Sequence, residues 1–96
     1  MVYCVAYDIV NDKVRRQVVK LCKQTGLMRI QKSIFIGKTE SFRIKNLENE
    51  VKAMIDSKRD RFLIAPFDNL AFQQLQFLGF QPDKKLLAHE IQVMFF

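Results

Sequence analysis

The sequence has few of the residues that build disulfide-bonded, metal-clustered or membrane-spanning proteins. Its 96 residues include two cysteines, one histidine, three glycines, two prolines and no tryptophan. Cys4 and Cys22 lack metal-ligand spacing, so we expect two reduced, buried thiols, and the lone His89 is more typical of a structural or exposed residue than of a ligand. No apolar run reaches the roughly 18 residues of a membrane helix. We therefore expect no cysteine metal site and no membrane span.

Acidic residues are almost absent between residues 13 and 45. This segment has ten basic residues and one acid, Glu40, which gives it a net charge of +9, whereas the remainder of the chain carries −3. The basic residues are Lys13, Arg15, Arg16, Lys20, Lys23, Arg29, Lys32, Lys38, Arg43 and Lys45. Charge distributed so unevenly points to a polyanion as the partner.

The length of the chain limits its architecture. Ninety-six residues form one small domain, residues 1–96, with a single core and little stability to spare, and such domains often gain burial by pairing with a second copy. The N-terminus has a charge-free strand pattern rather than a basic stretch before an apolar leader. We therefore expect no signal peptide and a cytoplasmic protein.

Residues 2–9 are apolar, aromatic or small except for one carboxylate, Asp8, and this pattern is typical of a strand buried on both faces. Asn11 or Asp12 then offers a side-chain oxygen to cap a helix. An aspartate at the carboxyl end of a strand, facing a cationic helix start, is a common way to build a metal or phosphate site. A solvated strand end is the alternative, and spacing alone leaves both open.

The helix predicted over residues 12–25 has an apolar face and a basic face. Its apolar residues are Val14, Val18, Leu21, Cys22 and Thr25. On the opposite side, Lys13, Arg16, Lys20 and Lys23 follow one another at helical spacing, and no acid comes after Asp12. We call these four residues the basic ridge. A solvated helix face usually mixes both signs of charge, so we interpret the ridge as a nucleic-acid-binding surface.

The middle of the chain contains further predicted elements. Residues 27–38 are extended, either as one long strand or as a hairpin that folds back near Lys32, and periodicity does not decide between them. A second helix fits residues 40–57, and a strand fits residues 61–67 before the turn at Asp68-Asn69.

The C-terminal part is less regular. Residues 71–80 are ambiguous, with a strand favoured over the second half, and residues 90–96 form a final apolar strand. The element order predicts a ferredoxin-like α+β fold, βαββαβ, with two helices on one face of an antiparallel sheet. Asp8 would share the uncovered face with Val2, Cys4 and Ala6, a row of small residues that suits close approach of a second subunit.

Two stretches at this spacing resemble the Cas-two (Cas2) family of CRISPR-associated proteins, the small partners of the CRISPR integrase. The stretches are Tyr7-Asp8-Ile9 with Asn11-Asp12-Lys13-Val14-Arg15-Arg16, and Gly26-Leu27-Met28-Arg29-Ile30-Gln31-Lys32-Ser33-Ile34-Phe35-Ile36-Gly37. The resemblance extends over essentially the whole chain. It departs from the family at Gln17, where some members have another arginine, and over residues 68–80.

The resemblance implies a homodimer that exchanges its C-terminal strand and acts in antiviral defence. It implies that Asp8 is the Mg²⁺ ligand of an endonuclease site at the dimer interface, acting on RNA or double-stranded DNA. Family positions that support this site or hold phosphate are Tyr7, Arg15, Arg29, Ser33 and Phe35. Members also serve as a DNA-bridging adaptor between integrase dimers, where cleavage is not required, and this role is the alternative.

Physical chemistry gives the same importance to Asp8. One carboxylate is too little to hold Mg²⁺, but a two-fold dimer brings two copies together. Because no base lies nearby in the sequence, hydrolysis would depend on metal-bound water. Asp8 follows six apolar residues, so we expect it to be at least partly buried. Its charge would then be compensated by a metal, by an arginine such as Arg15, or by protonation.

Overall fold

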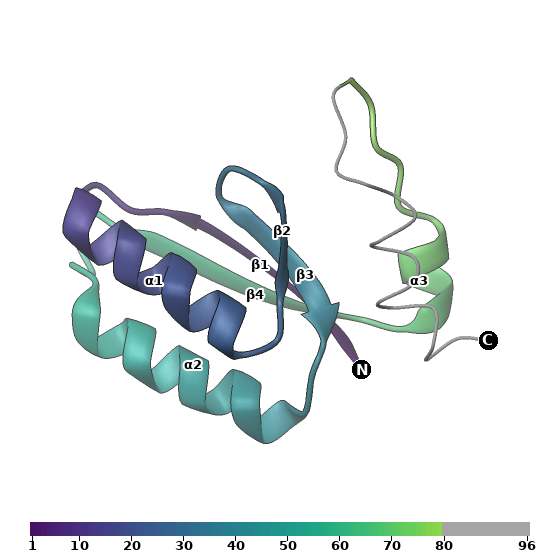
Figure 1. The fold of residues 1–96 in the computed structure, drawn as a ribbon, viewed down its shortest axis with the longest axis horizontal. Coiled ribbons are helices and arrows are strands. Elements are labelled where there is room, and N and C mark those ends of the chain that lie inside the picture. The colour runs from purple at the N-terminus through teal and green to yellow at the C-terminus, as the bar shows by residue number, and fades with distance from the viewer. Residues whose placement is uncertain (80–96) are drawn as a thin grey trace.

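The computed structural model describes residues 1–79, which form an antiparallel sheet with two helices on one face (Figure 1). The elements are β1 (Val2–Asp8), α1 (Asp12–Gln24), β2 (Met28–Gln31), β3 (Ile34–Lys38), α2 (Ser41–Met54), β4 (Arg61–Phe67) and α3 (Asn69–Gln73). The sheet order is β2-β3-β1-β4, with antiparallel neighbours throughout. The predicted ferredoxin-like βαββαβ order is confirmed.

β1 is a central strand and carries the core of the sheet. It pairs with β3 from Val2 to Ala6 and with β4 along its whole length. Val5 and Tyr7 point toward the helices and are buried with Phe35 of β3 in the main core. Because side chains alternate along a strand, the intervening residues of β1 face the opposite side of the sheet.

α1 begins and ends where the sequence indicates. Asn11 caps it, since its Oδ1 accepts a hydrogen bond from the Val14 N–H at 2.9 Å. Val18 and Cys22 are fully buried, as the apolar periodicity predicts. Gly26 follows the helix with a φ of 97°, a left-handed conformation that glycine adopts without steric cost.

Residues 28–38 form a hairpin, which resolves the alternative that periodicity left open. β2 and β3 pair in antiparallel register from Met28 opposite Ile36, and the chain turns at Lys32 and Ser33. The turn places Phe35 in the core at 0% exposure and Ile36 on the other face of the sheet.

α2 and β4 complete the βαββαβ unit. α2 lies within the predicted helix of residues 40–57 and buries Ile44, Leu47 and Val51. Among the described strands, β4 lies at an edge of the sheet, which is compatible with a proline at position 66 because an edge strand has N–H groups that need no partner. Among the helices of residues 1–79, none combines the length and apolarity needed to cross a membrane.

The strand favoured over the second half of residues 71–80 is wrong for the residues that the structure describes. A short helix, α3, forms first because the Asp68 carboxylate accepts a hydrogen bond from the Ala71 N–H at 2.7 Å and caps it. No regular structure follows as far as Gly79. Phe72 and Leu75 instead pack beside Val2 at one end of the open sheet face. The predicted strand over residues 90–96, and His89, lie outside the described residues.

Gly37 of β3 permits the close packing of the β3 backbone against the chain that leaves α1. A Cβ built at Gly37 would lie 2.9 Å from the Gly26 carbonyl oxygen and 3.1 Å from the Leu27 Cα, and both are backbone atoms. We therefore expect Gly37→Ala to lower the free energy of unfolding by about 1–3 kcal/mol, measured by urea denaturation. Lys38→Ala, at the exposed neighbouring position, is the control and should cost less than about 0.5 kcal/mol. A Gly37→Ala variant as stable as this control would contradict the packing described.

Candidate nucleic-acid and metal site

Asp8 is the last residue of β1 and lies on the sheet face opposite the helices. The preceding side chain, Tyr7, belongs to the core, so strand alternation directs Asp8 to the other side. Its pairing partner in β4 is Arg61. Within residues 1–79 the carboxylate accepts no hydrogen bond and forms no ion pair. Asp8 therefore keeps all its acceptor capacity for a ligand from outside this part of the chain.

The expectation that Asp8 is at least partly buried is wrong for the single chain, where Asp8 is exposed. The β1–β3 ladder ends with Ala6 opposite Ile34, so among the described strands only β4 flanks the last residue of β1. Neither α1 nor α2 reaches the open face of the sheet (Figure 1). Arg15 does not pair with this carboxylate either, because its guanidinium bonds the Ile9 carbonyl and the Asp12 carboxylate.

The open face beside Asp8 is apolar. At the far end of this face, Val2 and Ile36 are buried beneath Phe67 and the segment that follows it. Nearer Asp8, the cover is lost: Ala6 and Ile34 are half-buried, and Leu63 is 61% exposed. An apolar strip therefore leads from the covered end of the sheet to the Asp8 carboxylate.

Three stacked aromatic rings lie on the helix side of the sheet. The Tyr7 ring centroid is 6.3 Å from that of Phe35 and 6.2 Å from that of Phe62, with the rings nearly parallel. The Tyr7 hydroxyl is buried and has no hydrogen-bond partner among the described residues. Burial raises the pKa of Tyr7, although the charges of Arg29 and Arg15 oppose the shift, and so does the proximity of the Arg29 guanidinium to the hydroxyl, which falls short of hydrogen-bond geometry. Tyr7 is therefore a neutral core phenol.

Arg29 and Ser33 shape the β2–β3 hairpin. The Arg29 guanidinium donates to the Lys32 carbonyl from Nε at 3.0 Å and from Nη2 at 2.6 Å, and it lies 5.8 Å from the centre of the Phe35 ring. The Ser33 carbonyl accepts a hydrogen bond from the Tyr7 N–H at 3.1 Å. The structure thus brings Tyr7, Arg29, Ser33 and Phe35 together, but the Asp8 side chain points to the opposite face.

Arg15 is bound to its own chain at the start of α1. Its Nη1 donates to the Ile9 carbonyl at 2.8 Å, and its Nη2 bonds the Asp12 carboxylate. These contacts brace the loop that follows Asp8. A guanidinium has five N–H donors, so this role leaves donors for a phosphate.

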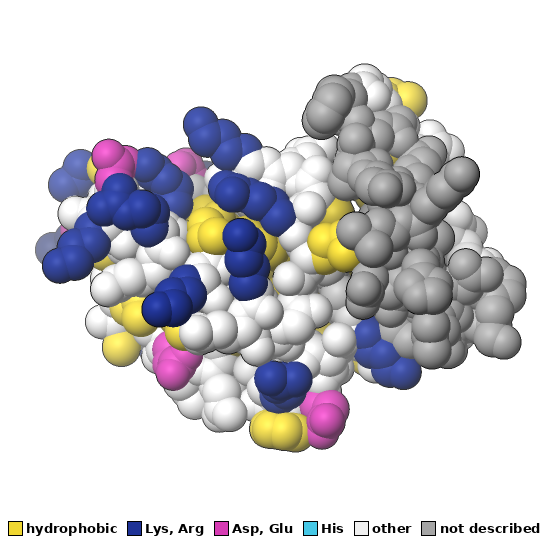
Figure 2. All heavy atoms as spheres, viewed as in Figure 1, with side chains coloured by type: hydrophobic (Ala, Val, Ile, Leu, Met, Phe, Trp, Pro, Cys, Tyr) yellow, Lys and Arg dark blue, Asp and Glu magenta, His cyan; other side chains and the backbone are white. Residues whose placement is uncertain are grey.

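The basic ridge is exposed along the outer side of α1. Lys13, Arg16, Lys20 and Lys23 are all exposed, and none of them forms an ion pair within residues 1–79. Figure 2 shows lysine and arginine side chains gathered over α1 and the neighbouring hairpin, with few acids among them. Charges that lack counterions within the described chain favour a polyanionic ligand.

A metal ion would find one suitable side chain in this region of a single chain. Residues 1–79 contain no group of three or more histidine, cysteine, aspartate or glutamate side chains that could hold an ion. The exposed Asp8, which has no partner in this range, suits one position in a Mg²⁺ shell, in which one or two carboxylates are joined by water and phosphate. One chain therefore supplies one carboxylate, which fits half of a Mg²⁺ site shared between two chains.

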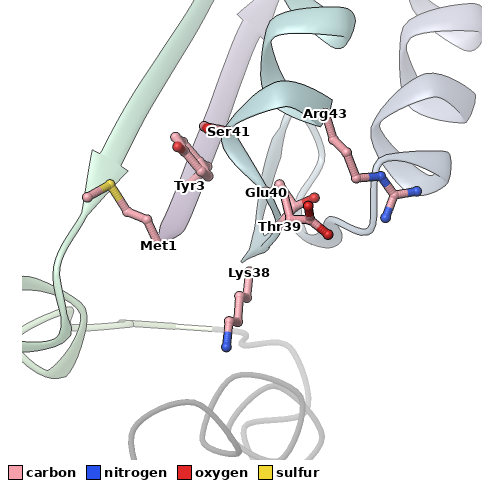
Figure 3. Close-up of a pocket in the computed structure, with 7 residues that line it drawn as sticks. All are labelled: Met1, Tyr3, Lys38, Thr39, Glu40, Ser41 and Arg43. Atoms are coloured by element: carbon pink, nitrogen blue, oxygen red, sulfur yellow. The ribbon is translucent and has the colours of Figure 1, made fainter.

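A separate hollow lies where β3 meets α2 (Figure 3). Its lining residues are Met1, Tyr3, Lys38, Thr39, Glu40, Ser41 and Arg43. Figure 3 shows Lys38 pointing away from Thr39 and Glu40. None of the site residues predicted from the sequence lines this hollow, so it is not the predicted phosphodiesterase site.

Sequence reasoning missed Asp60, which supports the loop after Asp8. The Asp60 Oδ1 accepts a hydrogen bond from the Val10 N–H at 2.9 Å. This contact joins residues fifty positions apart, and no local sequence pattern signals it.

The fold and the site define a class: a small ferredoxin-like α+β domain with a basic helix face and an aspartate at the end of its first strand. The family model described as CRISPR associated protein Cas2 matches residues 1–75. The chain therefore belongs to the Cas2 family.

Individual relatives agree with this assignment. A CRISPR-associated endoribonuclease Cas2 from Desulforudis audaxviator is 40% identical over 62 residues, which are 65% of this chain but only 58% of that relative. A Pyrobaculum aerophilum protein named CRISPR-associated endoribonuclease Cas2 2 is 33% identical over 82 residues, 85% of this chain and 90% of its own.

Solved structures show the same fold. Cas2 from Streptococcus pyogenes, at pH 6.5, has a TM-score of 0.72 and 25% identity, covering 82% of this chain and all of its own. The hypothetical protein TT1823 from Thermus thermophilus also has a TM-score of 0.72, with 30% identity, covering 84% of this chain and 93% of its own.

The buried Tyr7 hydroxyl provides a test of the aromatic stack. An unpaired buried hydroxyl is costly, so Tyr7→Phe should leave the free energy of unfolding unchanged or raise it by up to about 1 kcal/mol in urea denaturation. Tyr3→Phe, at a half-buried tyrosine, is the control and should change stability by less than about 0.5 kcal/mol. Clear destabilisation by Tyr7→Phe alone would show that the hydroxyl has a hydrogen-bond partner.

Proposed function

We propose that this chain acts in CRISPR adaptation as a cytoplasmic homodimer that binds nucleic acid and cleaves RNA or double-stranded DNA with Mg²⁺. Membership of the Cas2 family and the endoribonuclease names of its relatives support the nuclease class. The observation that carries the proposal is the exposed Asp8 carboxylate, which has no partner within residues 1–79.

Dimerisation is supported by the apolar strip beside Asp8. Leu63 is 61% exposed and lies on the same face as the half-buried Ala6 and Ile34. A two-fold dimer that covers this strip would bury its apolar surface and bring two Asp8 side chains toward one axis. Exchange of the C-terminal strand between subunits would enlarge the interface, although residues 90–96 lie outside the described part of the chain.

In such a dimer, Asp8 and Asp8 of the partner subunit would hold Mg²⁺. The bound ion would supply a water of lowered pKa and stabilise the charge that develops on the phosphate. The chain itself supplies the carboxylates, and the basic ridge binds the nucleic-acid backbone. Arg15 and Arg29 would bind phosphate through the guanidinium N–H groups that do not bond the Ile9 and Lys32 carbonyls.

The alternative function is a non-catalytic adaptor that bridges double-stranded DNA and binds the CRISPR integrase. It needs no metal site, because the exposed basic ridge, which forms no ion pair within residues 1–79, is enough to hold a duplex. The basic ridge serves this role equally well, because phosphate contacts position a duplex without reading its bases.

Asp8→Asn separates the two functions. The variant should abolish Mg²⁺-dependent cleavage while fold, dimer and duplex affinity remain unchanged, because Asp8 is exposed and makes no polar contact within residues 1–79 that the substitution could break. Cleavage is measured on RNA and duplex DNA, with and without Mg²⁺. Unchanged Mg²⁺-dependent cleavage by a folded Asp8→Asn dimer would refute the role of Asp8. A wild-type protein that binds duplex without cleaving either substrate would favour the adaptor.

The basic ridge is tested by a charge-reversal pair. Lys20→Glu with Lys23→Glu should weaken duplex binding about equally for unrelated sequences and reduce the slope of log K against log salt, by roughly 0.9 for each phosphate that the protein no longer neutralises. Lys45→Glu with Lys52→Glu, at exposed positions of α2, makes the same change in net charge and should have a smaller effect. Equal weakening by both pairs would mean that net charge, rather than the ridge, governs binding.

A further inference from the structure

Each of the three residues that follow Asp8 takes part in a hydrogen bond that involves a side chain. The Ile9 carbonyl accepts a hydrogen bond from Arg15 Nη1 at 2.8 Å, and the Val10 N–H donates to Asp60 Oδ1 at 2.9 Å. Asn11 is fixed as the cap of α1. Arg15 and Asn11 belong to the start of α1, whereas Asp60 comes from the distant loop before β4. Asp60 therefore joins the loop after β1 to the loop before β4, two segments that are far apart in the sequence.

Asp60 uses its two oxygens for different donors. While Oδ1 accepts from Val10, Oδ2 accepts from the Asp56 N–H at 2.9 Å. The loop that carries it is closed by its own hydrogen bonds, since the Asp56 carbonyl accepts from the N–H groups of Arg59 at 3.0 Å and Asp60 at 2.8 Å. Asp60 thus attaches the residue two positions beyond Asp8 to a loop that is itself well braced.

This attachment lies beside β4, the strand that flanks Asp8. Asp60 immediately precedes Arg61, and Arg61 is the pairing partner of Asp8 in β4. The β1–β3 ladder has already ended at Ala6. Within residues 1–79, the last hydrogen bond on the β3 side is the one from the Tyr7 N–H to the Ser33 carbonyl, so Asp8 itself is flanked by β4 and, two residues further on, the chain is held by the Asp60 carboxylate.

We propose that Asp60 is a positioning residue for the Asp8 metal site, acting through the Val10 N–H and touching neither metal nor substrate. The proposal rests on the proposed function, in which Asp8 is the ligand. By fixing the backbone after Asp8, Asp60 sets the direction in which the two Asp8 carboxylates of a dimer converge. Groups hydrogen-bonded directly to a metal ligand commonly affect metal affinity about 10- to 100-fold, and Asp60, which acts one step further away through the backbone, is expected at the lower end of that range.

The hydrogen-bond pattern requires a carboxylate at position 60. The two backbone N–H bonds lower the pKa of Asp60, so both oxygens are acceptors at neutral pH. Asparagine offers one acceptor oxygen, and its amide group would face the second N–H, donor against donor. Asp60→Asn therefore loses one of the two bonds. Asp56→Asn makes the same charge change in the same loop but keeps its bond, because the Asp56 Oδ1 accepts only from the Lys58 N–H among the described residues, as an amide oxygen also can.

The experiment compares wild type, Asp60→Asn and Asp56→Asn as full-length protein. Mn²⁺ affinity is measured by calorimetry, exchange of the Val10 amide by NMR, and duplex affinity without metal as a reference. Where faster Val10 exchange shows that the Val10 bond is the one lost, we expect Asp60→Asn to weaken Mn²⁺ binding about tenfold with duplex affinity unchanged. If the amide oxygen keeps the Val10 bond instead, Asp60→Ala, which removes both acceptors, replaces Asp60→Asn and carries the same expectation. Asp56→Asn should match wild type in all three. A purely structural role for Asp60 would lower stability without a selective loss of Mn²⁺ affinity.

Asp60→Glu keeps both acceptor oxygens and serves as the rescue variant. If Asp60→Asn does not fold, this variant decides: a protected Val10 amide with Mn²⁺ affinity within about threefold of wild type supports the assignment. The assignment is overturned if folded Asp60→Asn or Asp60→Glu protein binds Mn²⁺ as wild type does while its Val10 amide is unprotected. It is also overturned if Asp56→Asn loses as much Mn²⁺ affinity as Asp60→Asn does. If the wild-type protein binds no Mn²⁺, the proposed metal site itself is wrong. If the wild-type protein binds Mn²⁺ and Asp60→Asn with an unprotected Val10 amide binds it equally well, only the positioning role of Asp60 is wrong.

Discussion

The packing of both main helices against one face of the sheet is the constraint on which the rest of the structure depends. Val5 and Phe35 of the sheet, Val18 and Cys22 of α1 and Leu47 of α2 are at most 1% exposed, so this interface is complete. A domain of this size has no further element among residues 1–79 to cover the whole opposite face. The apolar strip beside Asp8 is the consequence within residues 1–79, and it is the observation that supports the proposed second subunit.

The same constraint divides the residues that the family resemblance groups together. Tyr7, Phe35 and Arg29 are on the helix side, where they fix the aromatic stack and the hairpin. Asp8 lies on the open side and makes no polar contact within residues 1–79 that would explain it structurally. Of the predicted site residues, Tyr7, Arg29 and Phe35 therefore have a clear architectural role in the chain itself. The proposed role in chemistry falls to Asp8, which would acquire it by association of two chains.

Local sequence pattern predicted the elements well, because helix and strand periodicity and the Asn11 cap are properties of neighbouring residues. It failed where tertiary structure decides. A hairpin and a long strand share one alternation, and the exposure of Asp8 depends on where a neighbouring strand begins. The strand favoured over the second half of residues 71–80 does not form as far as Gly79, and Phe72 and Leu75 pack beside Val2 instead. Asp60 was missed because its partner is fifty residues away.

The stoichiometry of divalent-metal binding is the most direct test of a metal site formed by two copies of Asp8, one from each chain. Calorimetric titration of the full-length protein with Mn²⁺ should give one ion for every two chains, and Asp8→Asn should remove this binding. One ion per chain, or binding that persists in Asp8→Asn, would contradict a site shared between subunits.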